Sequence, residues 1–164
     1  MVESVLMTIM VMCVVMVTIS LIMINRENKV FNTSINNLVI PKNQYVALVI
    51  EWSHNNLKNH NTKKPMVTVK YNQNKKVHGT YNPSTHEITV YVNNHPTIKE
   101  LTNTKIHEYI HARQKNRSFD RLYKEQNNTV GYMKNFYEVE SIVISGKNEE
   151  KCIKDIISRY KVLK

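Results

Sequence analysis

The sequence predicts an α+β protein, in which one N-terminal transmembrane helix precedes a small domain of helices and a short antiparallel sheet. Three observations carry this prediction: an uncharged run from Val5 to Ile24, alternation of polar and apolar residues between Met66 and Val92, and helical spacing of apolar residues on either side of that region. At 164 residues, the chain has room for a single domain behind the apolar run. We expect a membrane anchor at residues 1–25, a polar linker at 26–42 and the domain at 43–164.

The apolar run contains only Val, Ile, Leu, Met, Thr, Ser and one Cys. Its length as a helix matches the hydrocarbon core of a bilayer, which is roughly 30 Å thick. A cleaved signal peptide is the alternative, and it would need a basic start and small residues before a cleavage site. Glu3 is the only early charge, and Ser20 to Asn25 offers no such site. We therefore favour a retained single-pass anchor.

The basic residues near the anchor predict its orientation. Arg26 and Lys29 follow the apolar run, whereas no basic residue precedes it. The positive-inside rule then places the C-terminal domain on the cytoplasmic side of the membrane. Cysteine usage agrees, because Cys13 lies in the apolar run and Cys152 is alone in the rest of the chain, so the domain has no internal disulfide.

The first half of the domain predicts one helix and then strands. Residues 44–58 carry apolar side chains at helical spacing, including Trp52, which we assign to the core. Residues 65–71, 77–81 and 87–92 have strand character and are separated by turn-forming residues. Two or three antiparallel strands joined by short turns are the simplest arrangement.

The second half predicts helices. Thr97 is a candidate N-cap with Glu100 three residues later, so a helix should run from Ile98 to Gln114. We expect a loop at 116–131 and a helix from Asn135 to about Ser145. Gly146 should end that helix, and a last helix should follow at 149–160.

A complete H-E-x-x-H motif, His107-Glu108-Tyr109-Ile110-His111, lies inside the helix expected at 98–114. Two histidines four residues apart project from one face of a helix, where both can bind one zinc ion. The glutamate between them is then beside the metal, where a general base for water is required. The motif predicts a zinc site with Glu108 as the base.

The order of elements, together with this motif and a later glutamate-bearing helix, resembles the zincin metallopeptidases, and more narrowly the small, minimal gluzincins. The resemblance covers residues 44–145. In that family the third zinc ligand is a glutamate in a pattern E-x-x-A-D-x-x-A, to which Glu138, Ser141 and Ser145 correspond. Small residues on the face of Glu138 would let its helix approach the histidine helix closely. Glu140 is the alternative third ligand, but the spacing favours Glu138.

One position departs from the family pattern. Its Asp is replaced by Ile142, which cannot accept the hydrogen bond that a zinc-bound imidazole usually donates. A backbone carbonyl, Asn135 or Asn103 would have to accept it.

The resemblance implies the chemistry of the site. Zinc would be held by His107, His111 and Glu138, with a fourth position open for water. Tyr132, Tyr137 and His95 are candidates, by residue type alone, to stabilise the oxyanion. An extended peptide substrate would pair with an edge strand at 87–92.

Functions of three kinds follow from these patterns. A membrane-anchored zinc metalloendopeptidase acting on protein or peptide substrates is favoured. A catalytically inactive zincin-like protein, with a structural or assembly role in a membrane or virion, is second, and the missing Asp supports it. A nucleic-acid-binding role has only the net charge of +10 behind it, and the lysines are scattered rather than gathered on one face.

Overall fold

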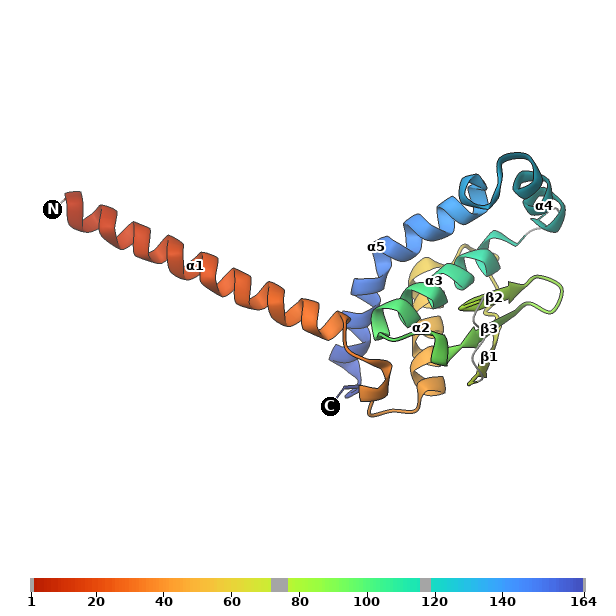
Figure 1. Ribbon diagram of the computed structural model, residues 1–164, viewed down its shortest axis with the longest axis horizontal. Helices are drawn as coiled ribbons and strands as arrows, with labels where there is room; N and C mark the ends of the chain where they lie inside the picture. The colour runs from red at the N-terminus through yellow and green to blue at the C-terminus, as the bar shows by residue number, and fades with distance from the viewer. Residues whose placement is uncertain (1, 72–76, 116–118, 164) are drawn as a thin grey trace.

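The computed structural model describes the chain at residues 2–71, 77–115 and 119–163. A long helix, α1 (Val2–Phe31), projects away from a domain that contains all the other elements (Figure 1). The segment Ile9–Phe31 is long and apolar enough to cross a membrane, with a mean hydropathy of 2.2 in its most apolar window, where no residue is buried. The helix continues past residue 25, the expected end of the anchor.

The remainder of the expected linker lies against the domain. Phe31 and Ile35 are buried, and Ile35 belongs to a short 3-10 helix, η1 (Ile35–Asn37). On either side of it the chain forms isolated antiparallel bridges, Ser34 with Thr97 and Leu38 with Leu163. The backbone N–H of Val39 also donates to the carbonyl of Val162, at 2.9 Å. The junction between α1 and the domain is therefore ordered.

The sheet has three strands in the order β1 (Met66–Lys70), β3 (Glu87–Tyr91), β2 (Gly79–Asn82). The three strands fall where the sequence predicts them. β2 and β3 are antiparallel, but β1 is parallel to β3, so the prediction of an all-antiparallel sheet is wrong. β3 carries the fully buried Ile88 and Val90 and takes the central position, which leaves β1 to pair with its other edge. The turn predicted at 72–76 lies outside the described residues.

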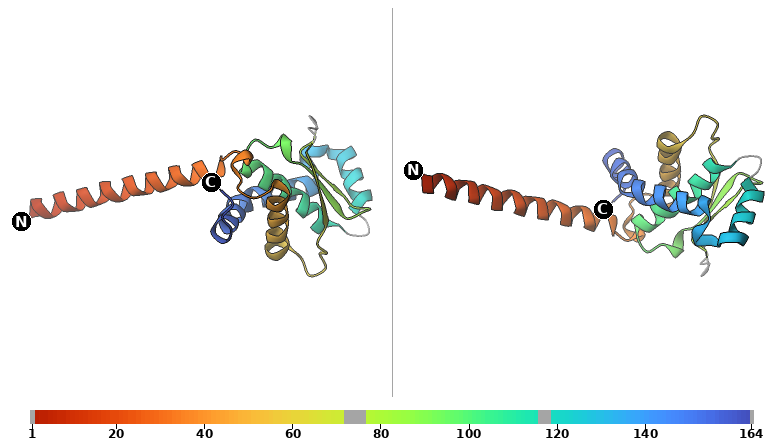
Figure 2. Two further views of the ribbon diagram at one scale, coloured as in Figure 1. Left: turned by 90° about the horizontal axis from the view of Figure 1, so that it is seen from below. Right: turned by 90° about the horizontal axis from the view of Figure 1, so that it is seen from above.

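α2 (Lys42–Leu57) and α3 (Ile98–Gln114) pack beside the sheet, and α5 (Phe136–Arg159) packs on these two helices. α3 contacts β2, β3, α2 and α5, so it is the centre of the domain (Figures 1 and 2). The Thr97 hydroxyl accepts a hydrogen bond from the N–H of Glu100 at 3.2 Å, and α3 has the predicted bounds. Trp52, assigned to the core from the sequence, is buried, as are Tyr45, Leu101, Ile106, Ile110 and Ile153.

Two expectations for the second half of the domain are wrong. A helix, α4 (Phe119–Val130), occupies the segment expected to be a loop, and the short 3-10 helix η3 (Tyr132–Lys134) follows it. The asparagines and glutamines of this segment hide an amphipathic pattern in which Phe119 is buried. α5 is one continuous helix, and Gly146 does not end it.

Helical spacing explains the continuity of α5. Its buried positions continue through Gly146 without a change of phase: Glu138, Ser141, Ser145, Glu149, Cys152, Ile153 and Ile156. A glycine inside a helix costs about 1 kcal/mol relative to alanine. Packing of the continuous face against α3 and α2 outweighs that cost.

Candidate metal centre

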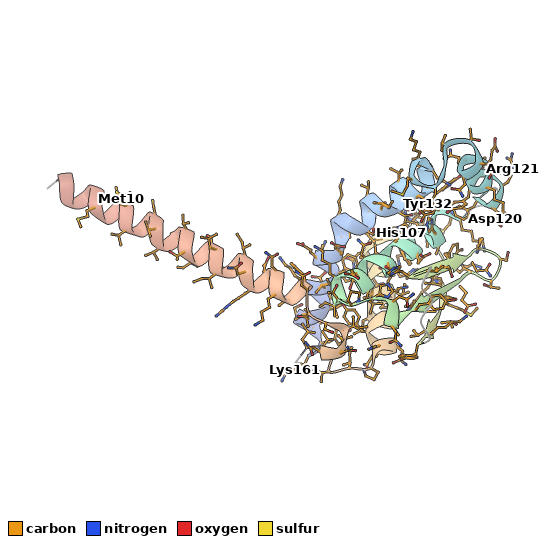
Figure 3. All side chains as sticks on the ribbon, in the orientation of Figure 1. Met10, His107, Asp120, Arg121, Tyr132 and Lys161 are labelled. Atoms are coloured by element: carbon orange, nitrogen blue, oxygen red, sulfur yellow. The ribbon has the colours of Figure 1, made fainter. Side chains whose placement is uncertain are left out.

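The contact between α3 and the first turns of α5 brings together His107, His111 and Glu138. The two imidazole Nε2 atoms are 3.1 Å apart. Nε2 of His107 is 3.2 Å from Oε2 of Glu138, and Nε2 of His111 is 3.3 Å from Oε1. Figure 3 places His107 near Tyr132, at the end of the domain where α3, α4 and α5 meet and away from α1.

These separations fit a tetrahedral metal site. Ligand atoms bound to zinc at about 2.0–2.1 Å lie about 3.3 Å from one another. Two imidazole nitrogens and a carboxylate bring lone pairs to one point, which is unfavourable unless a cation is shared between them. Oε2 of Glu138 is buried and makes no well-aligned hydrogen bond with the described residues, although Nε2 of His107 lies 3.2 Å away. The three side chains could therefore hold a metal ion.

The charges around Glu138 favour its ionised form. Burial acts to raise the pKa of Glu138, but hydrogen bonds from His107, His111, Tyr123 and Tyr132 outweigh burial and lower it. Burial acts to lower the pKa of His111, whereas the hydrogen bond with Glu138 and the nearby charges raise it overall. The ionised Glu138 carboxylate therefore favours the protonated form of His111.

Small side chains let α5 approach α3 at this point. Ser141 and Ser145 are buried, one and two turns after Glu138, on the face that contacts α3. The Ser141 hydroxyl lies 3.4 Å from Nδ1 of His111, and the Ser145 hydroxyl donates to the side-chain carbonyl of Asn103 at 3.5 Å. A larger residue at either position would separate the two helices.

Glu140, the alternative third ligand, is engaged elsewhere. Its carboxylate forms an ion pair with the guanidinium of Arg113. It also accepts a hydrogen bond from Nε2 of Gln114 at 2.8 Å. The metal-binding group among the described residues contains Glu138 and not Glu140.

Gln114 can accept the hydrogen bond from His111 that the family's Asp, replaced here by Ile142, would accept. Its Oε1 lies 2.9 Å from Nδ1 of His111, while its Nε2 donates to the carbonyl of Tyr137 at 3.0 Å. Asn135 instead caps α5, and Asn103 donates to Glu149 at 2.5 Å. A residue three positions after the second histidine lies one turn along the same face of the helix, and this spacing is the signal that could have identified Gln114.

Tyr123 is a second residue that sequence reasoning did not assign to the site. Its hydroxyl donates to Oε1 of Glu138 from α4, and its ring packs edge-on against His111 with centroids 6.0 Å apart. With a loop expected here, Tyr123 suggested only packing. The helical spacing of Phe119 and Tyr123, one turn apart, is the signal that would place both on the side facing the site.

A cavity of about 430 Å³ opens beside the metal-binding group. Glu108 lines it and is 7% exposed, and burial raises the pKa of its carboxyl. β2 forms one wall, and α3, α4, η3 and α5 contribute the rest. The lining residues are Val77, Gly79, Thr80, Tyr81, Pro83, Glu108, His111, Phe119, Asp120, Tyr123, Lys124, Tyr132 and Glu138. A larger cavity of about 770 Å³, beside residues 59–63, is lined by none of the metal-binding group.

Of the three candidates for oxyanion stabilisation, Tyr132 lines this cavity. The ring of Tyr137 packs against Phe119, with centroids 5.1 Å apart. His95 is buried, and its Nε2 lies 3.1 Å from the Thr104 hydroxyl. Burial lowers the pKa of His95 to about 4, so it is neutral. Neither Tyr137 nor His95 lines the cavity.

The expected substrate strand also changes. The segment at 87–92 contains β3, which is paired on both sides and offers no free edge for a peptide. β2 is the edge strand that lines the cavity. It lies close to α3 at Gly79, where an added Cβ would be 2.9 Å from Nζ of Lys105 and 3.2 Å from Cγ of Glu108.

Lys105 is an unusual feature beside the site. It is completely buried two residues before the motif, and its ammonium has no hydrogen-bond partner among the described residues. Burial lowers its pKa to about 7, against the opposing attraction of Glu108. The buried amine is part of the charge environment of Glu108.

Comparison of the chain with protein-family models, curated proteins and solved structures finds no match. The resemblance to gluzincins inferred from the sequence therefore stays a prediction.

Proposed function

We propose that the protein is a membrane-anchored, zinc-dependent metallopeptidase with its domain on the cytoplasmic side. The observation that carries the proposal is the set of separations between the ligand atoms of His107, His111 and Glu138, which lie 3.1–3.3 Å apart. A purely structural zinc site is usually closed by four protein ligands. Here two of the three ligands, His111 and Glu138, line a cavity that Glu108 also lines, as a hydrolytic site requires.

The residues of the chain divide the work of peptide hydrolysis. A bound zinc ion would supply Lewis acidity, lowering the pKa of a water and polarising the scissile carbonyl. Glu108 accepts the proton of the attacking water and transfers it to the leaving amine. Its raised pKa suits a base that must hold this proton between the two transfers. Tyr132 lines the cavity, and its hydroxyl, now hydrogen-bonded to Glu138, would have to turn from that carboxylate to donate to the oxyanion.

The second candidate is an inactive zincin-like protein with a structural or assembly role. It is supported by Ile142, which stands where the family has an Asp. The contact of Gln114 with Nδ1 of His111 weakens that argument, because an amide oxygen can accept the imidazole N–H in place of a carboxylate.

The test uses the full chain purified in detergent. We expect about one zinc per chain and cleavage of an unfolded protein such as reduced casein. Glu108→Gln should keep the zinc and lose cleavage, because it removes the base and leaves the ligands. His107→Ala should lose both zinc and cleavage.

The two candidates give different results. Zinc bound at full occupancy without cleavage of any unfolded protein would favour the inactive protein. Cleavage that is unchanged in Glu108→Gln would remove the proposed mechanism.

A further inference from the structure

The domain begins very close to the end of the apolar run in α1. The run ends at Ile24, and Phe31, seven residues later in the same helix, is buried in the domain. A helix rises 1.5 Å per residue, so this separation is about 10 Å. Lipid headgroups occupy roughly the first 5–7 Å beyond the hydrocarbon core. If α1 crosses a bilayer, the part of the domain around Phe31 lies directly beside the headgroup layer.

Contacts with α1 bring a lysine of α5 to this level. Nζ of Lys154 lies 2.9 Å from Oε2 of Glu27 and 5.6 Å from the centroid of the Phe31 ring. Glu27 and Phe31 are one turn apart on the same face of α1. Lys154 is 127 positions away from Glu27 in the sequence, so only the fold places it there.

The segment that follows α5 adds a second lysine. This segment lies against the chain that follows α1, through the bridge between Leu38 and Leu163 and the hydrogen bond from Val39 to Val162. Lys161 precedes these contacts and is exposed, and its side chain lies near the domain end of α1 (Figure 3). The other two views of the ribbon agree, because the end of the chain lies beside the domain end of α1 in both (Figure 2).

Two basic residues of α1 complete a group of four, which we call the membrane-proximal basic cluster: Arg26, Lys29, Lys154 and Lys161. All four are exposed. Arg26, Lys29 and Lys161 form no ion pair within the part of the chain that the structure describes. The side chains of Lys154 and Glu27 are 49% and 52% exposed, so solvent weakens their pairing and leaves Lys154 available to another anion.

The position and size of the cluster favour one kind of partner. Anionic headgroups attract cations held near a membrane surface, and this attraction decays within a Debye length of about 8 Å. Clusters of about four to eight Lys or Arg residues beside a membrane span are typical of sites for anionic lipids. Arg26 and Lys29 alone fall short of that number, and Lys154 and Lys161 complete it.

We propose that the membrane-proximal basic cluster binds the headgroups of anionic phospholipids in the leaflet where α1 ends. The site is discontinuous, because α1 supplies Arg26 and Lys29 whereas the fold brings Lys154 and Lys161 beside them. The inference rests on the membrane anchor in the proposed function and is independent of its chemistry.

The experiment measures the lipid preference of the full chain reconstituted in phosphatidylcholine vesicles. The EPR spectra of spin-labelled lipids report how many of them are immobilised by the protein. We expect spin-labelled phosphatidylserine to associate at least about threefold more strongly than spin-labelled phosphatidylcholine. In about 1 M NaCl, where the Debye length is about 3 Å, the preference should disappear.

A pair of charge-removing variants tests the contribution of the fold. Lys154→Gln combined with Lys161→Gln should reduce the preference for phosphatidylserine by about half or more. The control combines Lys115→Gln with Lys134→Gln, two exposed lysines at the end of the domain away from α1, and removes the same charge. The control should keep the full preference, and both variants should keep the zinc content of the unaltered chain.

The possible outcomes separate the cluster from the anchor. A full preference in the Lys154 and Lys161 variant would overturn the discontinuous site. Equal association of the two lipids with the unaltered chain would overturn the cluster as a lipid site and leave the anchor in place. A chain that alkaline carbonate extracts from the vesicles would overturn both the anchor and the site.

Discussion

In the first half of α5 the buried face is polar and the exposed face is apolar, which is the reverse of most helices that pack on a domain. Toward α3 the first half of the helix presents polar side chains, Glu138, Ser141 and Ser145, all of them buried. Away from the domain it presents Val139 and Val143, which are exposed. If hydrophobic burial alone determined the packing, this half of the helix would be rotated so that Val139 and Val143 faced the domain. The difference shows that polar contacts with α3 and the close approach of the two helices decide which face is inside.

The buried polar face is stable because its groups have partners on α3. Glu149 accepts from Nδ2 of Asn103 at 2.5 Å and pairs with Lys99 at 3.2 Å, and Ser141 contacts His111. Buried polar groups in folded proteins are nearly always paired in this way. The second half of α5 returns to the usual pattern, with Cys152, Ile153 and Ile156 inside.

The largest effect is expected from a substitution at Glu138, on the buried face of α5. Glu138→Gln removes the only carboxylate in the metal-binding group, and we expect zinc content to fall to background and cleavage to fall by roughly a thousandfold or more. Metal analysis and a cleavage assay measure the two effects. Glu150→Gln, an exposed carboxylate on the same helix, should change neither, and zinc retained by the Glu138 variant would exclude it as a ligand.

Lys105 sharpens the comparison, since its buried ammonium has no hydrogen-bond partner in the part of the chain that the structure describes. Its lowered pKa means that the unfolded chain binds more protons than the folded one between about pH 7 and 10.5, so stability should rise with pH across that window. Lys105→Met should raise the free energy of unfolding at pH 7 by a few kcal/mol, since each pKa unit corresponds to about 1.4 kcal/mol. Denaturation in detergent at several pH values measures this gain, which should shrink toward pH 10.5. Equal gains at pH 7 and pH 10 would contradict the assignment.

Ser145 tests how tightly the inner face must pack. Ser145→Leu inserts a larger side chain between α3 and α5 and should cost about 1–3 kcal/mol of stability. It should also weaken zinc binding, because it moves Glu138 away from the imidazoles. Val143→Leu, on the outer face two residues earlier, serves as the control and should leave the unfolding midpoint and zinc content unchanged.

The smallest expected effect belongs to the outer face. Val143→Ser should change the stability of the detergent-solubilised protein by less than about 0.5 kcal/mol, because an exposed side chain loses no protein contacts. Ile153→Ser, on the buried face of the same helix, should cost several kcal/mol. Comparable losses of stability in the two variants would mean that the Val143 side chain packs against protein.

Local patterns predicted what depends on local chemistry. The cap at Thr97 set the start of α3, and the alternation around Ile88 and Val90 located β3. The structure also brings Glu138, rather than Glu140, beside both imidazoles, as the spacing of the small residues predicts. These inferences use neighbours within a turn or two of one element.

Long-range partners were beyond the reach of the sequence. Alternation identifies strands but does not choose their neighbours, so the parallel pairing of β1 with β3 was missed. The polar composition of residues 119–130 predicts a loop, whereas the structure has the helix α4 there. Because the helix was not predicted, Tyr123 was not assigned to the site. Gly146 suggested a helix end, but α5 continues past this residue because it packs against α2 and α3.

The ordered junction between α1 and the domain has a consequence for selectivity. With Phe31 and Ile35 buried in the domain, no loose segment separates α1 from the domain. A peptidase domain on a long flexible linker can reach substrates over a wide range of distances from the membrane. A domain held rigidly can reach only polypeptide at one fixed distance from the membrane. Distance from the lipid, more than residue preference, would then determine which peptide bond is cut.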